Sequence, residues 1–178
     1  MNAQLISRAL LAAALLSGTA QATDGTINFT GTLTSSTCTV SVNGGSDVTL
    51  PTLSTDALTD AGSWAGRTPF TVDLSSCSME DSLTTVGLYF ETTSEIDSSN
   101  GTLNNSGTAS NVQVRLRNAD YDVLDLTGGD MDSQNSLAAT PDGSGNASID
   151  FFAEYYSEAG SAGAGTVTAQ AVFSLNYQ

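Results

Sequence analysis

Histidine and lysine are absent from this chain, and its 178 residues include only two cysteines, three prolines and one tryptophan. Without histidine the chain cannot build a Ser-His-Asp or Cys-His catalytic arrangement, or a histidine-ligated metal site. Four arginines stand against 19 acidic residues, which gives a net charge of −15. Such an acidic chain repels nucleic acid and anionic lipid surfaces. We therefore expect no histidine-dependent catalytic or metal site and no nucleic-acid partner.

The first 22 residues have the composition of a secretory signal peptide. Arg8 is followed by an apolar run over residues 9–16, and the segment closes on the Ala20-Gln21-Ala22 cleavage pattern. The run is too short to span a bilayer as a helix. Removing residues 1–22 leaves a mature chain of 156 residues with three arginines and a net charge of −16, enough for one domain with a core.

Cys38 and Cys77 are the only cysteines. An even pair in an exported protein indicates one disulfide, with two free thiols as the less favoured alternative. Closing a loop of 39 positions would stabilise the fold by about 4 kcal/mol, less any strain.

Residue composition indicates an all-β fold. Thr, Ser, Gly, Val and Asn abound, whereas the charged residues that favour helices are few. Turn-rich stretches separate the segments in which apolar residues alternate, and short strands at this spacing predict a β-sandwich. The alternating segments are "TINFTGTLT", "SDVTLPTL", "PFTVDLSSC", "TTVGLYFET", "NVQVRLRN", "YDVLDL", "ASIDFFAEYY" and "GTVTAQAVFSLNYQ". Only residues 54–66 suggest a short helical turn.

Both ends of the mature chain carry a one-faced apolar strand pattern. At the C-terminus every second residue is apolar or aromatic up to Tyr177, although chain ends usually fray. At the N-terminus Ile27, Phe29 and Leu33 alternate with polar residues, and Gly31 in their midst would allow close approach of another chain. These two strands could pair with each other or with other molecules.

Other candidate sites are weak. Asp130 and Asp132 lie in "GGDMDSQN", but the glycine and glutamate that an EF-hand loop requires are replaced by Asn135 and Pro141, so we expect a polar surface turn. The single Trp64 is the only obvious residue for stacking on a sugar, and we expect it to pack against the core instead. The pattern predicts no metal site.

Four motifs in order resemble the type 1-like pilins, the fimbrial subunits of chaperone–usher pili. They are "GTINFTGTLTSSTC", "PFTVDLSSC", "NVQVRLRNADYDVLDLTG" and "FFAEYYSEAGSAGAGTVTAQAVFSLNYQ". The last has a glycine fourteenth from the end, Gly165, and an aromatic second from the end, Tyr177. The resemblance covers the whole mature chain.

The resemblance implies an incomplete immunoglobulin-like β-sandwich that lacks its last strand and is completed by a donor strand from another chain. It divides the sequence into a signal peptide (1–22), a donor-strand extension (23–36) and a pilin domain (37–178). The donor residues would be Ile27, Phe29, Gly31 and Leu33. The acceptor groove and chaperone-binding strand would comprise Gly165, Val167, Ala169, Ala171, Phe173, Leu175 and Tyr177.

The implied function is a structural subunit of a surface fimbrium that polymerises by β-strand addition and supports adhesion. Its partners would be further copies of the subunit, other pilus subunits, a periplasmic chaperone and an outer-membrane usher. Export would run through the periplasm to the cell surface. Such a subunit would be no enzyme and would need no cofactor. Two alternatives stay open: a minor adaptor or tip pilin, and a secreted β-sandwich that binds carbohydrate or acts as an enzyme.

Overall fold

The computed structural model describes residues 27–43, 45, 47–80 and 82–178. The signal peptide predicted for residues 1–22 lies outside them. The chain divides into two units, Met1–Leu33 and Thr34–Gln178, and the fold below is that of the second.

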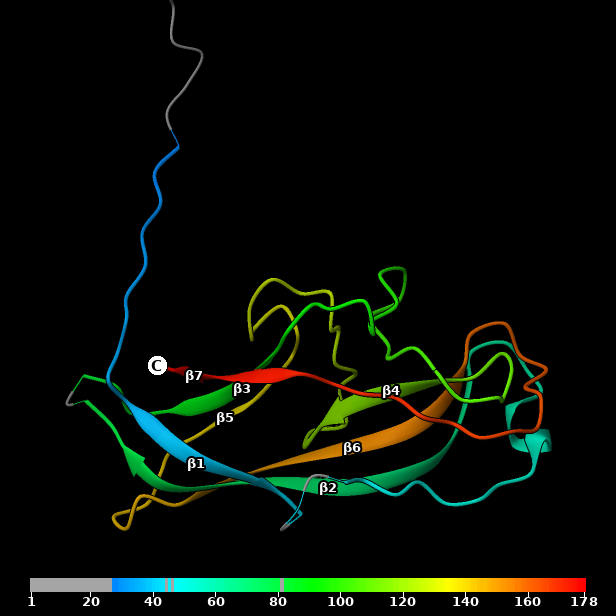
Figure 1. The fold of residues 1–178 in the computed structure, drawn as a ribbon, viewed down its shortest axis with the longest axis horizontal. Helices are drawn as coiled ribbons and strands as arrows, with labels where there is room; N and C mark the ends of the chain where they lie inside the picture. The colour runs from blue at the N-terminus through cyan, green and yellow to red at the C-terminus, as the bar shows by residue number, and fades with distance from the viewer. Residues whose placement is uncertain (1–26, 44, 46, 81) are drawn as a thin grey trace, which may run out of the picture. The chain divides into compact units, whose positions relative to one another are not determined.

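Four antiparallel strands form the larger sheet, in the order β1-β2-β6-β4 (Figure 1). Strand β1 spans Thr37–Val42, β2 spans Ser63–Ser78, β6 spans Ala147–Ser157 and β4 spans Gln113–Asn118. The long strands β2 and β6 lie at the centre of this sheet, and β1 forms one of its edges.

Three antiparallel strands form the second sheet, in the order β5-β3-β7. Strand β5 spans Ala138–Ala139, β3 spans Val86–Phe90 and β7 spans Phe173–Tyr177, so the last strand of the chain lies at an edge. The 3₁₀ helix η1, Thr55–Leu58, is capped by the Ser54 hydroxyl and lies where a short helical turn was expected.

The core forms where side chains from both sheets meet. Along β2 the residues alternate, so that Phe70, Val72 and Leu74 are buried while their neighbours face outward. Phe151 of β6 stacks on Phe70 and meets the edge of Phe90 from the opposite sheet. The all-β, two-sheet fold predicted from composition and alternation is therefore confirmed.

Strand β2 begins earlier than its apolar pattern suggests. It extends back to Ser63 through an irregularity between Ala65 and Thr68, where Gly66 adopts a φ of +70°. Glycine takes up this left-handed conformation without steric cost, which explains how the strand continues across the bulge.

The edge of β3 is completed by a side chain. Gln134 is fully buried; its amide oxygen accepts a bond from the Phe90 N–H, and its amide nitrogen donates to the carbonyls of Phe90 and Gly128. This buried amide, with its hydrogen bonds satisfied, holds the loop that contains Gln134 against β3. Among the described residues no helix is long and apolar enough to cross a membrane.

Candidate functional site

A groove of about 1060 Å³ runs between the two sheets of the Thr34–Gln178 unit. Its floor is the core itself, because buried residues from β2, β3, β4 and β6 line it. These residues are Phe70, Val72, Leu88, Phe90, Val114, Leu116 and Ala153. A groove floored by apolar core side chains in this way is a candidate for an interaction site.

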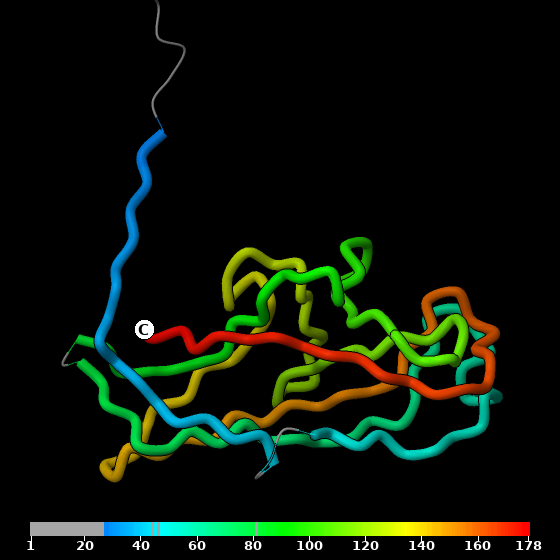
Figure 2. The backbone as a smooth tube through the Cα atoms, viewed as in Figure 1, coloured from blue at the N-terminus to red at the C-terminus, as the bar shows by residue number. Residues whose placement is uncertain are grey.

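One wall of the groove is the C-terminal segment, drawn in red in Figure 2. From residue 167 to residue 177, exposure alternates without a break between half-buried and exposed positions. The half-buried positions are the six predicted from the sequence: Val167, Ala169, Ala171, Phe173, Leu175 and Tyr177. The first four line the groove, and all six pack against the core without being covered by it.

The same segment has one bonded edge and one open edge. The carbonyls of Thr166, Thr168 and Val172 accept bonds from Ala109, Ser106 and Glu91, and Phe173–Tyr177 pairs with β3. The backbone groups of Val167, Ala169 and Ala171, which alternate with these, bond to no residue in the described part of the chain. An exposed sheet edge of this kind offers unpaired N–H and C=O groups to another strand.

The opposite wall is formed by Val42 and residues 47–50. Val48 and Leu50 are half-buried against the core, while Asp47 and Thr49 are exposed. The alternation predicted for "SDVTLPTL" is therefore present, but residues 47–50 form no strand. A strand requires a ladder of hydrogen bonds, and no described segment provides one beside them.

Tyr177, near the end of the C-terminal segment, contacts strand β1. Burial raises the pKa of its phenol, and a hydrogen bond with the Cys38 backbone partly opposes that shift. Cys38, on β1, is disulfide-bonded to Cys77 on β2, as the sequence predicted. The disulfide holds the edge strand β1 to its neighbour β2.

Gly165 lies just outside the groove lining. A Cβ atom there would collide with the backbone of Thr108 and Ala109. The glycine therefore lets the terminal segment approach the 105–109 loop closely enough for the hydrogen bonds made by Thr166 and Thr168.

The N-terminal segment, residues 27–33, belongs to the other unit and is described by itself. It forms no strand, and Ile27, Phe29 and Leu33 are 79%, 90% and 100% exposed. A Cβ at Gly31 would meet nothing within 4 Å. The apolar alternation seen in the sequence thus has no ladder partner among the residues that the structure describes.

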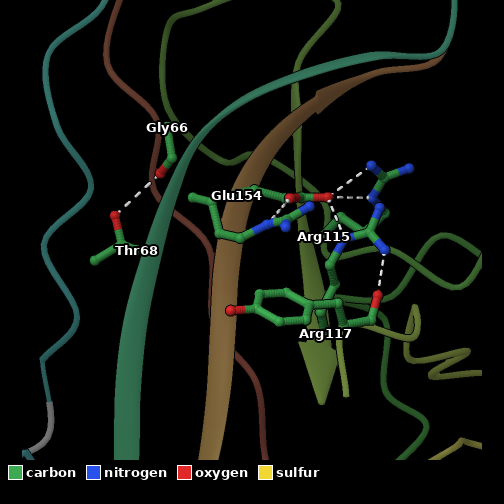
Figure 3. A network of polar contacts seen from close by, with 7 residues as sticks. Gly66, Thr68, Arg115, Arg117 and Glu154 are labelled. Atoms are coloured by element: carbon green, nitrogen blue, oxygen red, sulfur yellow. Dashed lines mark hydrogen bonds and ion pairs between the residues drawn. The ribbon is translucent and has the colours of Figure 1, made fainter. Parts of the chain in front are cut away.

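Sequence reasoning missed an ion cluster on the outer face of the larger sheet. Glu154 of β6 is fully buried and receives bonds from Arg67, Arg115 and Arg117, which are all the arginines of the predicted mature chain (Figure 3). Burial would raise the pKa of Glu154, but hydrogen bonds from the three guanidinium groups outweigh it and leave that pKa below its ordinary value. The partners are 37 to 87 positions apart, so only the strand register reveals them.

The position of Trp64 contradicts the prediction that this residue packs against the core. It is 46% exposed and lies outside the core, with the Arg67 guanidinium 4.2 Å from the centre of its ring. Its position follows from the strand, because it faces outward from β2 opposite Tyr156 of β6. The expected polar turn at Asp130 is present: the carboxylate accepts a bond from the Ser133 N–H, which lowers the pKa of Asp130.

Comparisons with known proteins identify the family to which this chain belongs. The family model for fimbrial proteins matches residues 27–178. The chain belongs to the fimbrial protein family. It is 40% identical over 175 residues to the major fimbrial subunit SMF-1 of Stenotrophomonas maltophilia, covering 94% of this chain and 99% of that protein.

A second fimbrial relative agrees with this assignment, and a solved structure shares the fold. The F17 fimbrial protein of Escherichia coli is 35% identical over 174 residues, covering 95% of each chain. The CupB6 tip adhesin of Pseudomonas aeruginosa shares the fold with a TM-score of 0.58 at 18% identity, over 78% of this chain and 37% of that longer one. The protein is a structural subunit of a pilus, and its place is the surface fimbrium.

Proposed function

We propose that this fimbrial subunit polymerises by donor-strand exchange, in which residues 27–33 of one copy fill the groove of the next. The supporting observation is the half-covered C-terminal wall, whose apolar face lies over an open core and whose outer backbone edge is unpaired. A donated strand would bury that face and pair with that edge, which is recognition by β-strand addition. Repeated head-to-tail donation does not close on itself and generates a filament.

The donor segment has the chemistry that the groove requires. Ile27, Phe29 and Leu33 are exposed in this chain, and burying each would contribute about 1.5–3 kcal/mol. Each ladder bond to residues 167–177 would add roughly 1 kcal/mol. Gly31 is the donor position at which two backbones can approach most closely.

The remaining roles follow from the same groove. Residues 1–22 direct export, residues 23–36 form the extension and residues 37–178 form the pilin domain, whose first strand begins at Thr37. Before assembly a periplasmic chaperone covers the C-terminal wall, and an outer-membrane usher receives the covered subunit. An uncovered groove would otherwise leave the apolar wall half-covered and a sheet edge unpaired, which invites aggregation.

A subunit that donates to itself tests this proposal. Residues 23–36 are removed from the N-terminus of the mature chain and fused after Gln178 through a Gly/Ser linker, so that the segment can return into its own groove. We expect a soluble monomer with a clearly higher melting temperature than the truncated chain, because an intramolecular donor has a high effective concentration. Circular dichroism melting curves provide the measurement.

The matched control carries Ile27→Asn and Phe29→Asn in the moved segment, which preserves its length but removes the apolar burial. This control should lose most of the gain in melting temperature. If the truncated chain is already a stable monomer, and the fused segment does not change its melting temperature, no groove awaits a donor and the proposal fails.

A further inference from the structure

The predicted mature chain holds all of its basic side chains in one cluster. It contains no lysine, and Arg8 belongs to the predicted signal peptide. The three remaining arginines, Arg67, Arg115 and Arg117, all bind the buried carboxylate of Glu154 (Figure 3). Exposed loops, where proteases most often cut a folded domain, therefore carry no lysine or arginine.

Little of each arginine side chain is open to solvent. The exposed fraction is 24% for Arg67, 12% for Arg115 and 15% for Arg117. The guanidinium of Arg67 lies 4.2 Å from the centre of the Trp64 ring, and that of Arg115 lies 4.3 Å from the centre of the Tyr156 ring. A protease of the trypsin class binds a basic side chain in a pocket that contains a carboxylate. In this chain a carboxylate of the same subunit already binds all three guanidinium groups.

The backbone at these positions is held in the sheet as well. Arg115 and Arg117 lie on β4 opposite Glu154 and Phe152 of β6, and Arg67 lies within β2 on the other side of β6. Cleavage requires a segment to leave the sheet, so its rate follows the population of a locally opened form. The cluster makes that opening less favourable, because opening separates guanidinium groups from a buried carboxylate.

We propose that the Glu154 cluster protects the folded subunit against proteases that cut after lysine or arginine, and that this protection is specific to that class. Sites for proteases that cut after aromatic or large aliphatic residues stay exposed: Leu53, in the loop before η1, is 42% exposed, and Tyr121, in the turn after β4, is 53% exposed. The subunit surface therefore discriminates between two classes of protease by the side chains it presents. This protection does not depend on donor-strand exchange and survives if that mechanism is wrong.

Digestion of native filaments, followed by mass spectrometry, tests the protection. Thr52→Arg provides the matched comparison, because Thr52 is exposed in a loop without strand pairing, next to Leu53. We expect trypsin to cut this variant after position 52 at least about 100-fold faster than after any of the three native arginines. Chymotrypsin should cut wild-type filaments after Leu53 or Tyr121.

Two outcomes of this digestion overturn the proposal. One is cleavage by trypsin at comparable rates after position 52 and after the native arginines. The other is resistance of the Thr52→Arg filaments to trypsin, or of the wild type to both proteases, because the filament as a whole would then be the source of the protection.

Glu154→Gln separates the contribution of the cluster from that of strand pairing. The variant keeps the size of the side chain but removes the charge that the three guanidinium groups share. We expect trypsin cleavage after the native arginines to rise about ten-fold, while chymotrypsin cleavage after the fully buried Phe151 stays at the wild-type level. The matched control is Asp150→Asn, whose carboxylate is bonded to the Thr71 hydroxyl, and it should leave the trypsin rate unchanged.

Cleavage after Phe151 shows whether the whole domain has opened, because this residue lies in the closed core. An equal rise at Phe151 and at the arginines would mean that Glu154→Gln loosens the entire fold. That result, or a trypsin rate that does not rise at all, would mean that the cluster gives no protection of its own and would overturn the proposal.

Discussion

Strand β6 and the C-terminal segment carry the same alternation of apolar residues but differ in what covers them. The inward residues of β6, Ile149, Phe151 and Ala153, are at most 4% exposed. The inward residues of 167–177 are all half-buried, although they pack on the same core. The difference lies in their neighbours, because β6 is paired on both sides and β7 pairs only with β3 among the described strands.

This contrast separates two questions that an apolar pattern combines. Alternation shows which face of a strand avoids water, but not which molecule excludes the water. The inward face of β6 is covered by the opposite sheet of the same chain. The inward face of residues 167–177 is only half covered in the described chain, and we propose that the exposed apolar residues of 27–33 from another copy cover the rest.

The largest expected effect comes from changing the donor. Phe29→Asp should abolish filament formation while the subunit still folds, because a carboxylate cannot be buried cheaply against an apolar floor. Thr30→Asp, on the opposite face of the segment, adds the same charge and should leave filaments intact. Electron microscopy of cells that produce each variant provides the measurement. Normal filaments from Phe29→Asp would remove residues 27–33 from the assembly mechanism.

A second prediction compares β6 with the groove wall directly. Phe151→Ala should lower the stability of the subunit by about 3–5 kcal/mol whether or not the groove is filled, because the cavity lies in a closed core. Phe173→Ala should cost clearly less in the truncated chain than in the self-complemented chain. The phenylalanine is half-buried in this chain, and the proposed donor would cover it.

Denaturant titration of both variants in both forms gives the four values needed. The informative quantity is the change in the cost of each substitution when the groove is filled. It should be near zero for Phe151 and positive for Phe173. Equal costs for Phe173→Ala in the two forms would mean that the segment is already covered within its own chain.

The sequence predicts the faces of strands better than their partners. It correctly identifies the alternating face of 167–177, the disulfide and the all-β fold, because each depends on local pattern or on a unique pair. It does not reveal that residues 47–50 form no strand, because strand formation requires hydrogen bonds to a neighbouring segment that the local pattern does not identify. It also misses the early start of β2, which requires a bulge at Gly66.

The polar residues that matter most to the fold were also hidden. Gln134 sits in a loop that looks merely polar, yet its amide completes the edge of β3. Trp64 looked like a core residue because tryptophan usually is one, but the strand register turns it outward. Long-range pairing, unlike alternation, leaves no periodic trace in a single sequence.

The third contrast, and the smallest expected effect, lies between the two faces of β6. Its inner face is stabilised by apolar burial, which is insensitive to pH, whereas Glu154 on its outer face is buried as a charge among three arginines. The pKa of Glu154 lies below its ordinary value of 4.5 because the hydrogen bonds from the arginines outweigh burial. A carboxyl whose pKa is lower in the folded chain stabilises the fold above its unfolded pKa. That stabilisation is lost as the pH falls toward the folded value.

Glu154→Gln in the self-complemented chain isolates this contribution. Near pH 7 the variant should melt below the parent, because three guanidinium groups lose their carboxylate. As the pH falls below 4.5 the parent's carboxyl becomes protonated, so the two melting temperatures should converge. Asp97, Asp130 and Asp142 also have lowered pKa values, but they are present in both proteins and cancel in the difference. A difference that stays constant from pH 7 to the acid limit would mean that the substitution acts through packing, and that Glu154 does not need its charge to hold the arginines.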